Sequence, residues 1–393
     1  MELGPHSPSL DLTKVSAQKV SRRGVLRGAL LLPLLLTSCS SDVAPKASSG
    51  SAGFETLKLD DSLVKAAQKE GTLVVRTSSP VDFIQSLSDK FNSKYGITLQ
   101  ADRRVGVVGT QQFAVEERAG KHVVDVMWNS DPLGLQNLAD EGFLQRYQFN
   151  ADIQSRLGKD VTLPGNVGYG PYKTELVISY NPKLISTEDA VAAFSNWEGL
   201  LKPEFRGGKF GMTEPAGGSV PFATYLMFYR EKKYGPEFLV KLAKQDPRLY
   251  NGSAPGREEL GSGAIVAYIT DWEYVAMQNY MKGATSQWTY PDIAPSFPAT
   301  HIALSSNAQH PNAARLLAAW VFSDEGAAAL GDLQVLSTLK GAADSRPAVE
   351  KLKQTDWWKP YPEAIKWFPD RADWDKSYPT LMPEMRQVLG WTS

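Results

Sequence analysis

The sequence predicts an α/β fold with two lobes, each built on a mostly parallel sheet flanked by helices. Short apolar runs alternate with amphipathic stretches along most of the chain, and polar loops that favour helix starts join them. The run at 123–128, apolar apart from Asp125, is typical of a parallel strand buried on both faces. Without a cleavable N-terminal segment the chain keeps about 350 residues, which is more than one hydrophobic core usually supports.

The N-terminal segment has the layout of an export signal. Arg22 and Arg23 precede an apolar run at 29–36 that is too short to span a bilayer, as in a secretory signal peptide. The paired arginines resemble a twin-arginine signal. Residues 36–39, Leu-Thr-Ser-Cys, resemble a bacterial lipobox, in which the cysteine becomes the lipidated first residue after cleavage. We therefore expect residues 1–38 to be a signal peptide.

The expected lipidation site, Cys39, is the only cysteine of the sequence, so no intrachain disulfide is expected. Residues 39–58 are predicted as a lipid-anchored flexible spacer, because half of this segment is Ser, Ala and Gly. We expect an exported protein, periplasmic or at the cell surface, that this anchor holds at the membrane. Loss of the signal peptide removes 5 of 42 Lys and Arg and 2 of 43 Asp and Glu, leaving a net charge of about −4. Such a surface has no polybasic footprint, which argues against a nucleic-acid partner.

The first lobe is predicted at 59–175, where strands are followed by polar loops and helices. Its predicted strands are 72–76, 97–101 and 123–128. After the first of them, Ser79 can cap a helix with proline at its first position. The polar residues of the three loops are Ser78, Ser79, Gly109, Thr110, Asn129 and Asp131.

The second lobe is predicted at 176–296, with strands at 176–180, 209–212 and 263–270. The loop from Glu214 to Ser219 contains two glycines before a helix start, which would let the backbone approach a ligand and aim amides at an anionic group. Ser253 lies in a similar capped start. Trp272, Glu273 and Tyr274 follow the last of these strands almost directly.

The chain is predicted to return to the first lobe at 297–345, through a strand at 301–305 and an amphipathic helix that opens at 310–312. The apolar stripe of this helix is interpreted as core. Residues 346–393 are predicted as a C-terminal helical tail, rich in tryptophan and packed on the lobes. A partner-binding surface is the alternative interpretation of the tail.

Polar residues at the strand ends are the candidate binding site. In open α/β sheets, ligands bind beyond the carboxyl ends of the strands, where helix starts present free N–H groups. The same residue types also cap helices without contacting any ligand. The candidate ligand-binding residues are Ser78, Ser79, Gly109, Thr110, Asn129, Asp131, Glu214, Gly218, Ser219, Ser253, Trp272, Glu273 and Tyr274.

Motifs of the common enzyme classes are absent from the sequence. It contains no GxxxxGK[ST], no HExxH and no GxSxG segment. The four histidines lack metal-ligand spacing, so neither a metal site nor a cofactor is predicted. We expect a protein that is not an enzyme. A secreted enzyme that uses Glu214, Asp271 or Glu273 as acid and base is the alternative.

Five segments in order resemble one protein family. They are 71–79 (GTLVVRTSS), 125–142 (DVMWNSDPLGLQNLADEG), 176–181 (LVISYN), 261–270 (GSGAIVAYIT) and 310–326 (HPNAARLLAAWVFSDEG). Together they are similar to the bacterial extracellular solute-binding proteins of ABC importers, in the branch that includes ferric-iron binders. The resemblance implies a periplasmic-binding-protein-like fold whose lobes, joined by strand hinges, close over a small solute. It further implies a monomer that hands its solute to a membrane permease; a ligand sensor for a membrane receptor is another alternative.

The resemblance leaves the ligand open. Iron-binding members carry adjacent tyrosines after the strand that aligns with 263–270, whereas this sequence has Trp272 and Glu273 there, followed by Tyr274. A carboxylate plus one phenol could hold a hard metal. An organic cation such as a polyamine or a thiamine-like amine would suit aromatic rings near carboxylates, here Trp128, Trp272, Tyr274, Trp288 and Tyr290 near Asp131, Glu214, Asp271 and Glu273. An anion such as a phosphonate or carboxylate would suit the glycine-rich helix starts and Arg103, Arg104 and Arg248.

Overall fold

The computed structural model describes residues 55–104, 106–215, 219–298 and 300–390. The expected signal peptide and Cys39 lie outside these residues. In the part of the chain that is described, no helix is both long enough and apolar enough to cross a membrane.

The first sheet has four strands in the order β12 (His301–Leu304), β4 (Val126–Asn129), β2 (Thr72–Thr77) and β3 (Thr98–Arg103). Strand β2 lies between β3 and β4 and is parallel to both, while β12 is antiparallel to β4. The carboxyl ends of β2, β3 and β4 therefore lie at one edge. Strand β12 comes from a distant part of the chain and pairs with β4 at one side of this sheet.

The second sheet has eight strands, and its long strand β6 (Tyr172–Tyr180) pairs with four others. The order is β14 (Lys366–Trp367), β11 (Ala294–Phe297), β6, β9 (Ala267–Trp272), β7 (Phe210–Thr213) and β8 (Arg248–Tyr250). Strands β10 (Gln287–Thr289) and β13 (Leu336–Ser337) also pair with β6. The pairs β7–β8, β7–β9 and β11–β14 are parallel, and every pair that includes β6 is antiparallel. A short sheet of β1 (Glu55–Leu57) and β5 (Tyr147–Phe149) completes the strands described.

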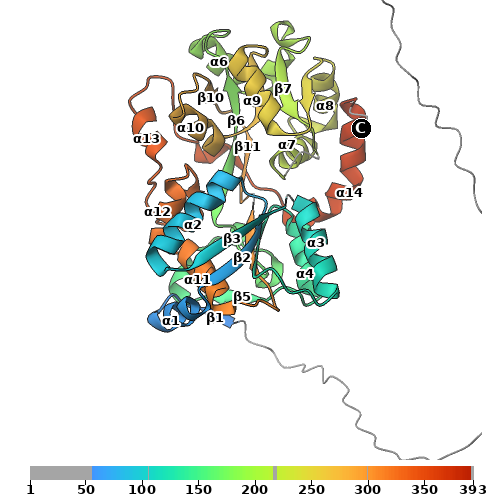
Figure 1. Cartoon of the computed structure of the whole chain (residues 1–393). Coiled ribbons are helices and arrows are strands. Elements are labelled where there is room, and N and C mark those ends of the chain that lie inside the picture. Colours follow the sequence, from blue (N-terminus) through green and yellow to red (C-terminus); the bar gives the residue numbers. More distant parts are fainter. Residues whose placement is uncertain (1–54, 105, 216–218, 299, 391–393) are drawn as a thin grey trace, which may run out of the picture. The chain divides into compact units, whose positions relative to one another are not determined.

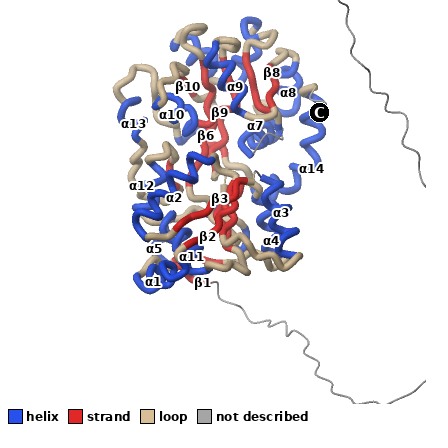
Figure 2. Tube along the Cα trace, in the orientation of Figure 1, coloured by secondary structure: helices blue, strands red, loops and turns tan. Residues whose placement is uncertain are grey.

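Helices cover both sheets (Figures 1 and 2). Those near the first sheet are α1 (Asp61–Glu70), α2 (Val81–Tyr95), α3 (Gly106–Arg118), α4 (Pro132–Asp140), α5 (Ala151–Arg156), α11 (Pro311–Val321) and α12 (Asp324–Gly331). Those near the second are α6 (Thr187–Phe194), α7 (Ser219–Arg230), α8 (Gly235–Ala243), α9 (Ser253–Ser262), α10 (Glu273–Met281), α13 (Pro347–Leu352) and α14 (Arg371–Val388). The predicted α/β class is confirmed, with a second sheet that is mixed.

Each sheet has its own large apolar core. Leu73, Val75 and Val126 of the first sheet pack with Leu87 and Phe91 of α2. In the second sheet, residues of β6, β7 and β9 pack with α7, α8 and α14. The predicted stripe of α11 is buried in the first core, as expected from its helical spacing.

One predicted helix begins earlier than expected. The pattern predicts a loop at Gly109 and Thr110 before a helix, but α3 already begins at Gly106. Both residues therefore lie within the first turns of the helix. Two successive valines, Val107 and Val108, favour a strand by residue type, but both are about half exposed on the helix surface.

Candidate functional site

Most of the candidate residues lie where strands of the two sheets end. Ser78 and Ser79 follow β2, and Asn129 is the last residue of β4. In the second sheet, Glu214 follows β7, Ser253 begins α9 shortly after β8, and Trp272 ends β9. Gly218 lies outside the described residues, and for Ser219 only its position as the first residue of α7 is described.

The starts of α3 and α4 are joined by side chains from the candidate set. Thr110 Oγ1 donates to Asp131 Oδ2 at 2.5 Å, and Asp131 Oδ1 caps α4 by accepting from the Gly134 N–H at 3.0 Å. Asn129 Oδ1 in turn accepts from the Asp131 N–H at 2.8 Å. A Cβ at Gly109 would lie 2.7 Å from Asn129 Nδ2, so only glycine permits this close approach.

A cavity of about 650 Å³ lies against these helix starts. This volume falls within the usual range for small-molecule sites. Thr110 and Asp131 line it on the side of the first sheet, together with Ser130. Trp374 and Tyr378 of α14 also line it. The tail therefore contributes to a cavity that contains two of the candidate residues.

Glu214 is buried and already paired. Its Oε2 accepts from Arg386 Nε at 3.1 Å and from Arg386 Nη2 at 3.0 Å, so its charge fastens α14 to the end of β7. Burial, followed by the charge of Asp131, raises the pKa of Tyr378, and Glu214 adds to this rise while Arg386 opposes it. The Tyr378 phenol thus lies within electrostatic reach of carboxylates from both sheets.

A second group of residues surrounds the guanidinium of Arg257, on α9. Arg257 Nε donates to Asp271 Oδ1 at 2.7 Å, and Asp271 Oδ2 accepts from Ser179 Oγ at 2.6 Å. The Arg257 Cζ lies 5.6 Å from the ring centroid of Trp272. Trp272 stacks on Tyr274 with centroids 5.7 Å apart. A partly buried cation therefore lies where β9 ends and α10 begins.

Tyr274 connects this group to the first sheet. Its ring contacts that of Tyr172 at a centroid distance of 6.3 Å, and Tyr172 contacts Phe83 of α2 at 5.4 Å. Burial raises the pKa of the Tyr172 phenol above its ordinary value. Burial also raises the pKa of Tyr274 well above its ordinary value. Both phenols are therefore held in their neutral forms.

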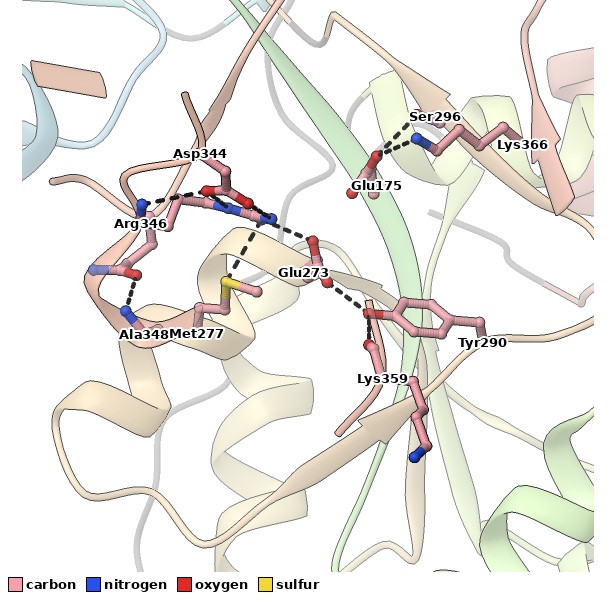
Figure 3. A network of polar contacts seen from close by, with 11 residues as sticks. Glu175, Glu273, Met277, Tyr290, Ser296, Asp344, Arg346, Ala348, Lys359 and Lys366 are labelled. Atoms are coloured by element: carbon pink, nitrogen blue, oxygen red, sulfur yellow. Dashed lines mark hydrogen bonds and ion pairs between the residues drawn. The ribbon is translucent and has the colours of Figure 1, made fainter. Parts of the chain in front are cut away.

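Glu273 points into a separate buried network (Figure 3). Its Oε1 accepts from the Tyr290 hydroxyl at 2.6 Å, and its Oε2 pairs with Arg346 Nη1 at 3.0 Å. Glu175 of β6 lies beside it and is paired with Lys366 Nζ at 3.3 Å. Burial, and next the charge of Glu273, raises the pKa of Glu175 to about 8 despite the opposing charge of Lys366. The Glu273 carboxylate is thus engaged within the protein.

Several hydrogen-bond donors at the strand ends have no partner, whereas the carboxylates there already accept hydrogen bonds. Ser78 Oγ, Asn129 Nδ2 and Trp272 Nε1 are buried and have no hydrogen-bond partner among the described residues. Asp131, Glu214, Asp271 and Glu273 each accept hydrogen bonds from protein groups. In the described ranges, no three His, Cys, Asp or Glu side chains gather in a way that could hold a metal ion.

The arginines named from the sequence differ in their availability. Arg248 is paired with Glu259 at 2.5 Å, and Arg104 with Asp102 at 3.2 Å. Arg103 donates through Nε to the Ser79 carbonyl at 3.1 Å, next to Ser78.

Sequence reasoning missed Arg257, Arg386 and Tyr378, because their partners are distant in sequence or appear only when the tail packs. Arg257 had one available signal, its position in the first turns of a predicted helix at the sheet edge.

Comparisons with known proteins agree on the fold. A family model described as bacterial extracellular solute-binding protein matches residues 73–332. Curated proteins give no match. Iron-bound HitA from Pseudomonas aeruginosa is 17% identical with a TM-score of 0.62, covering 81% of this chain and 99% of that one. An iron- and citrate-bound IdiA (FutA) from Trichodesmium is 13% identical with a TM-score of 0.63, covering 82% and 100%.

A third similar structure was solved with an organic ligand. It is the periplasmic binding protein AfuA from Actinobacillus pleuropneumoniae with exogenous fructose-6-phosphate bound. It is 16% identical, with a TM-score of 0.59, and the match covers 82% of this chain and 100% of that one. These likenesses confirm the predicted periplasmic-binding-protein-like fold.

Proposed function

Because the chain belongs to the bacterial extracellular solute-binding protein family, we propose that it captures an anionic solute at the strand ends and delivers it to an ABC permease. Membership of this family of binding proteins confirms the expectation that the chain is not an enzyme. The solute would lie between two lobes at 59–175 and 176–296, with 297–345 returning to the first lobe.

The observation that supports an anionic solute is the presence of unpartnered hydrogen-bond donors at the strand ends. Ser78 Oγ, Asn129 Nδ2 and Trp272 Nε1 lack acceptors among the described residues. A buried donor without a partner costs free energy, which a solute rich in acceptor oxygens would recover. A carboxylate or phosphate supplies such oxygens, and its hydrogen bonds to donors are strengthened by its charge.

Arg257 supplies the matching positive charge. Its guanidinium has five N–H donors, and Asp271 occupies only one edge of the fork. Two helices begin just after strands end: α2 after β2, and α9 after β8. Neither has a side-chain hydrogen bond at its N-cap, which is Pro80 in α2 and Gly252 in α9. Their N–H groups and partial positive charge add to the attraction for an anion.

The same contacts argue against an organic cation. Three of the four carboxylates that would attract one are already paired with an arginine: Glu214 with Arg386, Asp271 with Arg257, and Glu273 with Arg346. The Arg257 guanidinium already lies over the face of the Trp272 ring. A further cation would therefore meet repulsion where the cation–π interaction is needed.

Bare ferric iron is also disfavoured. Glu273, which aligns with the tyrosine pair of iron binders, turns toward Arg346 and Tyr290. Tyr274 is buried with its pKa raised well above the ordinary value, which opposes the phenolate that a hard metal requires. A metal ion carried within an anionic chelate would remain compatible with the donors described above.

A lipid on Cys39 would keep the receptor close to its permease. The segment that carries the export signal and this cysteine lies outside the described residues, so the tether rests on the sequence alone. Proximity matters because a tethered receptor meets its membrane partner at a high effective concentration.

A thermal-shift screen of the full-length protein tests the proposal. The panel contains inorganic anions, small carboxylates, organic phosphates, polyamines, thiamine, and ferric ion with and without citrate. A ligand that binds only the native state raises the melting temperature by mass action. We expect stabilisation by at least one anion and none by polyamines or thiamine. A shift with a cation alone would overturn the anionic assignment.

A further inference from the structure

The C-terminal helix α14 lies outside the segment matched by the family model, which ends at residue 332, yet it is firmly attached to the second sheet. Near its start, Asp373 forms a bidentate pair with Arg230 of α7, with both N···O distances at 2.5 Å. Near its end, Arg386 is paired with the buried Glu214. Two separate ion pairs therefore fix the position of the helix along its length.

Aromatic packing fixes its orientation between these two points. Trp374 meets Phe222 of α7 edge-on at a centroid distance of 4.8 Å, and Tyr378 meets the same ring at 4.7 Å. Trp374 is buried, whereas Tyr378 is half-buried. Because these two residues are four positions apart, they lie on one face of the helix. Both residues also line a cavity together with residues of α3 and α4.

The cavity of about 650 Å³ lies between α14 and the pair α3 and α4. One side contributes the Trp374 and Tyr378 rings. The other side mixes apolar side chains, among them Val115 and Leu133, with polar ones, among them Thr110 and Asp131. This volume is much larger than a single inorganic anion needs. Rings on one wall and hydrogen-bonding groups on the other suit an organic body that has both C–H faces and hydroxyl groups.

We propose that α14 forms one wall of the solute site, with Tyr378 in contact with the solute, and that the solute is a hydroxylated organic anion rather than an inorganic ion. This inference rests on the proposed function: Arg257 does not line the cavity, so the anionic group would extend beyond the cavity toward Arg257. Asp131 retains acceptor capacity after bonding Thr110 and Gly134, and it would accept from a solute hydroxyl.

Calorimetric titration of the full-length protein with matched probes tests this inference. The probes are inorganic phosphate, glucose 6-phosphate, bicarbonate and gluconate, which pair each inorganic anion with a hydroxylated one. The variants are Tyr378→Ala and Tyr378→Phe, with Thr380→Ala as the control because Thr380 is exposed on the same helix. We expect one hydroxylated anion to bind at least tenfold more tightly than its inorganic partner.

The variants separate the inference from the proposed function. Tyr378→Ala should weaken binding of the hydroxylated anion about tenfold and leave its inorganic partner unchanged, while Tyr378→Phe should keep the ring contact and most of the affinity. Equal affinity for both members of each pair, or no effect of Tyr378→Ala, would overturn the role of α14 but leave an anion receptor in place. If no probe binds the wild-type protein although the thermal-shift screen finds another anion that does, this inference fails and the proposed function stands.

Discussion

Glu175 and Glu273 lie side by side in a buried network although they belong to different elements, β6 and α10 (Figure 3). Burial, followed by the charge of Glu273, raises the Glu175 pKa to about 8. Tyr290 and Arg346 face Glu273, and Ser296 and Lys366 face Glu175. This network also joins the start of α10, which follows Trp272, to strands of the second sheet.

The raised pKa makes stability depend on pH. In the unfolded chain Glu175 ionises near pH 4.5, whereas in the folded protein it keeps its proton until about pH 8. The folded state therefore binds more protons between these values, and its contribution to stability falls as pH rises from 4.5 to 8. The Glu175→Gln side chain is neutral at every pH. The melting temperature of this variant, relative to that of wild type, should therefore increase as pH rises from 4.5 to 8.

Thermal melts of wild type, Glu175→Gln and Glu204→Gln at several pH values between 5 and 8 check this prediction. Glu204 is exposed and serves as the control, which should follow the wild-type curve. Parallel curves for Glu175→Gln and wild type would show that Glu175 is ionised in the folded protein at neutral pH.

The order of strands and helices could be predicted from the sequence, because burial on a sheet leaves a local pattern of apolar and polar residues. The partners of polar side chains could not. Glu214 and Glu273 both look available in the sequence, but Arg386 and Arg346, far along the chain, neutralise them. Only the packing of the tail brings these pairs together.

The start of α3 shows a different limit of sequence reasoning. Val107 and Val108 favour a strand by residue type, but the helix begins at Gly106 and includes both. The positions of Gly109 and Thr110 at the sheet edge were nevertheless predicted.

Gly109→Ala tests the contact between Gly109 and Asn129. Its Cβ would lie 2.7 Å from Asn129 Nδ2 and 3.0 Å from the Arg104 carbonyl, so the Asn129 side chain or the backbone must shift. We expect a loss of about 1–3 kcal/mol in the free energy of unfolding, measured by urea denaturation. Gly261→Ala is the matched control, because Gly261 lies in α9 with open space around it and should gain stability from helix propensity. Equal stability of both variants would show that Gly109 is not under steric constraint.

Asp131 should matter for stability through its cap. Asp131→Ala removes the cap of α4 and the hydrogen bond from Thr110, so we expect a loss of about 1–2 kcal/mol in the free energy of unfolding. Asp131→Asn keeps an oxygen that can cap the helix and should lose less. A urea denaturation series distinguishes the two, and an unaffected Asp131→Ala would mean that the cap contributes nothing.

The proposed tether can be tested separately. Cys39→Ser removes the acceptor of the lipid, so the exported protein should leave the membrane fraction. Fractionation followed by immunodetection measures its distribution. Wild-type protein should remain with the membranes. If both proteins fractionate alike, the residues that resemble a lipobox do not anchor the chain.

The central claim is that Arg257 holds the anionic group of the solute, and the most direct measurement is the affinity of the Arg257→Gln, Asp271→Asn double variant. Replacing both charges avoids leaving Asp271 buried and unpaired, which would itself destabilise the protein. Arg248→Gln is the control, since Arg248 is paired with Glu259 on the protein surface. Calorimetry should use the anion that most raises the melting temperature of wild type.

We predict that the double variant remains folded and binds this anion at least tenfold more weakly, while Arg248→Gln binds as wild type does. A folded double variant with wild-type affinity would contradict the account, because the anion would then be held elsewhere.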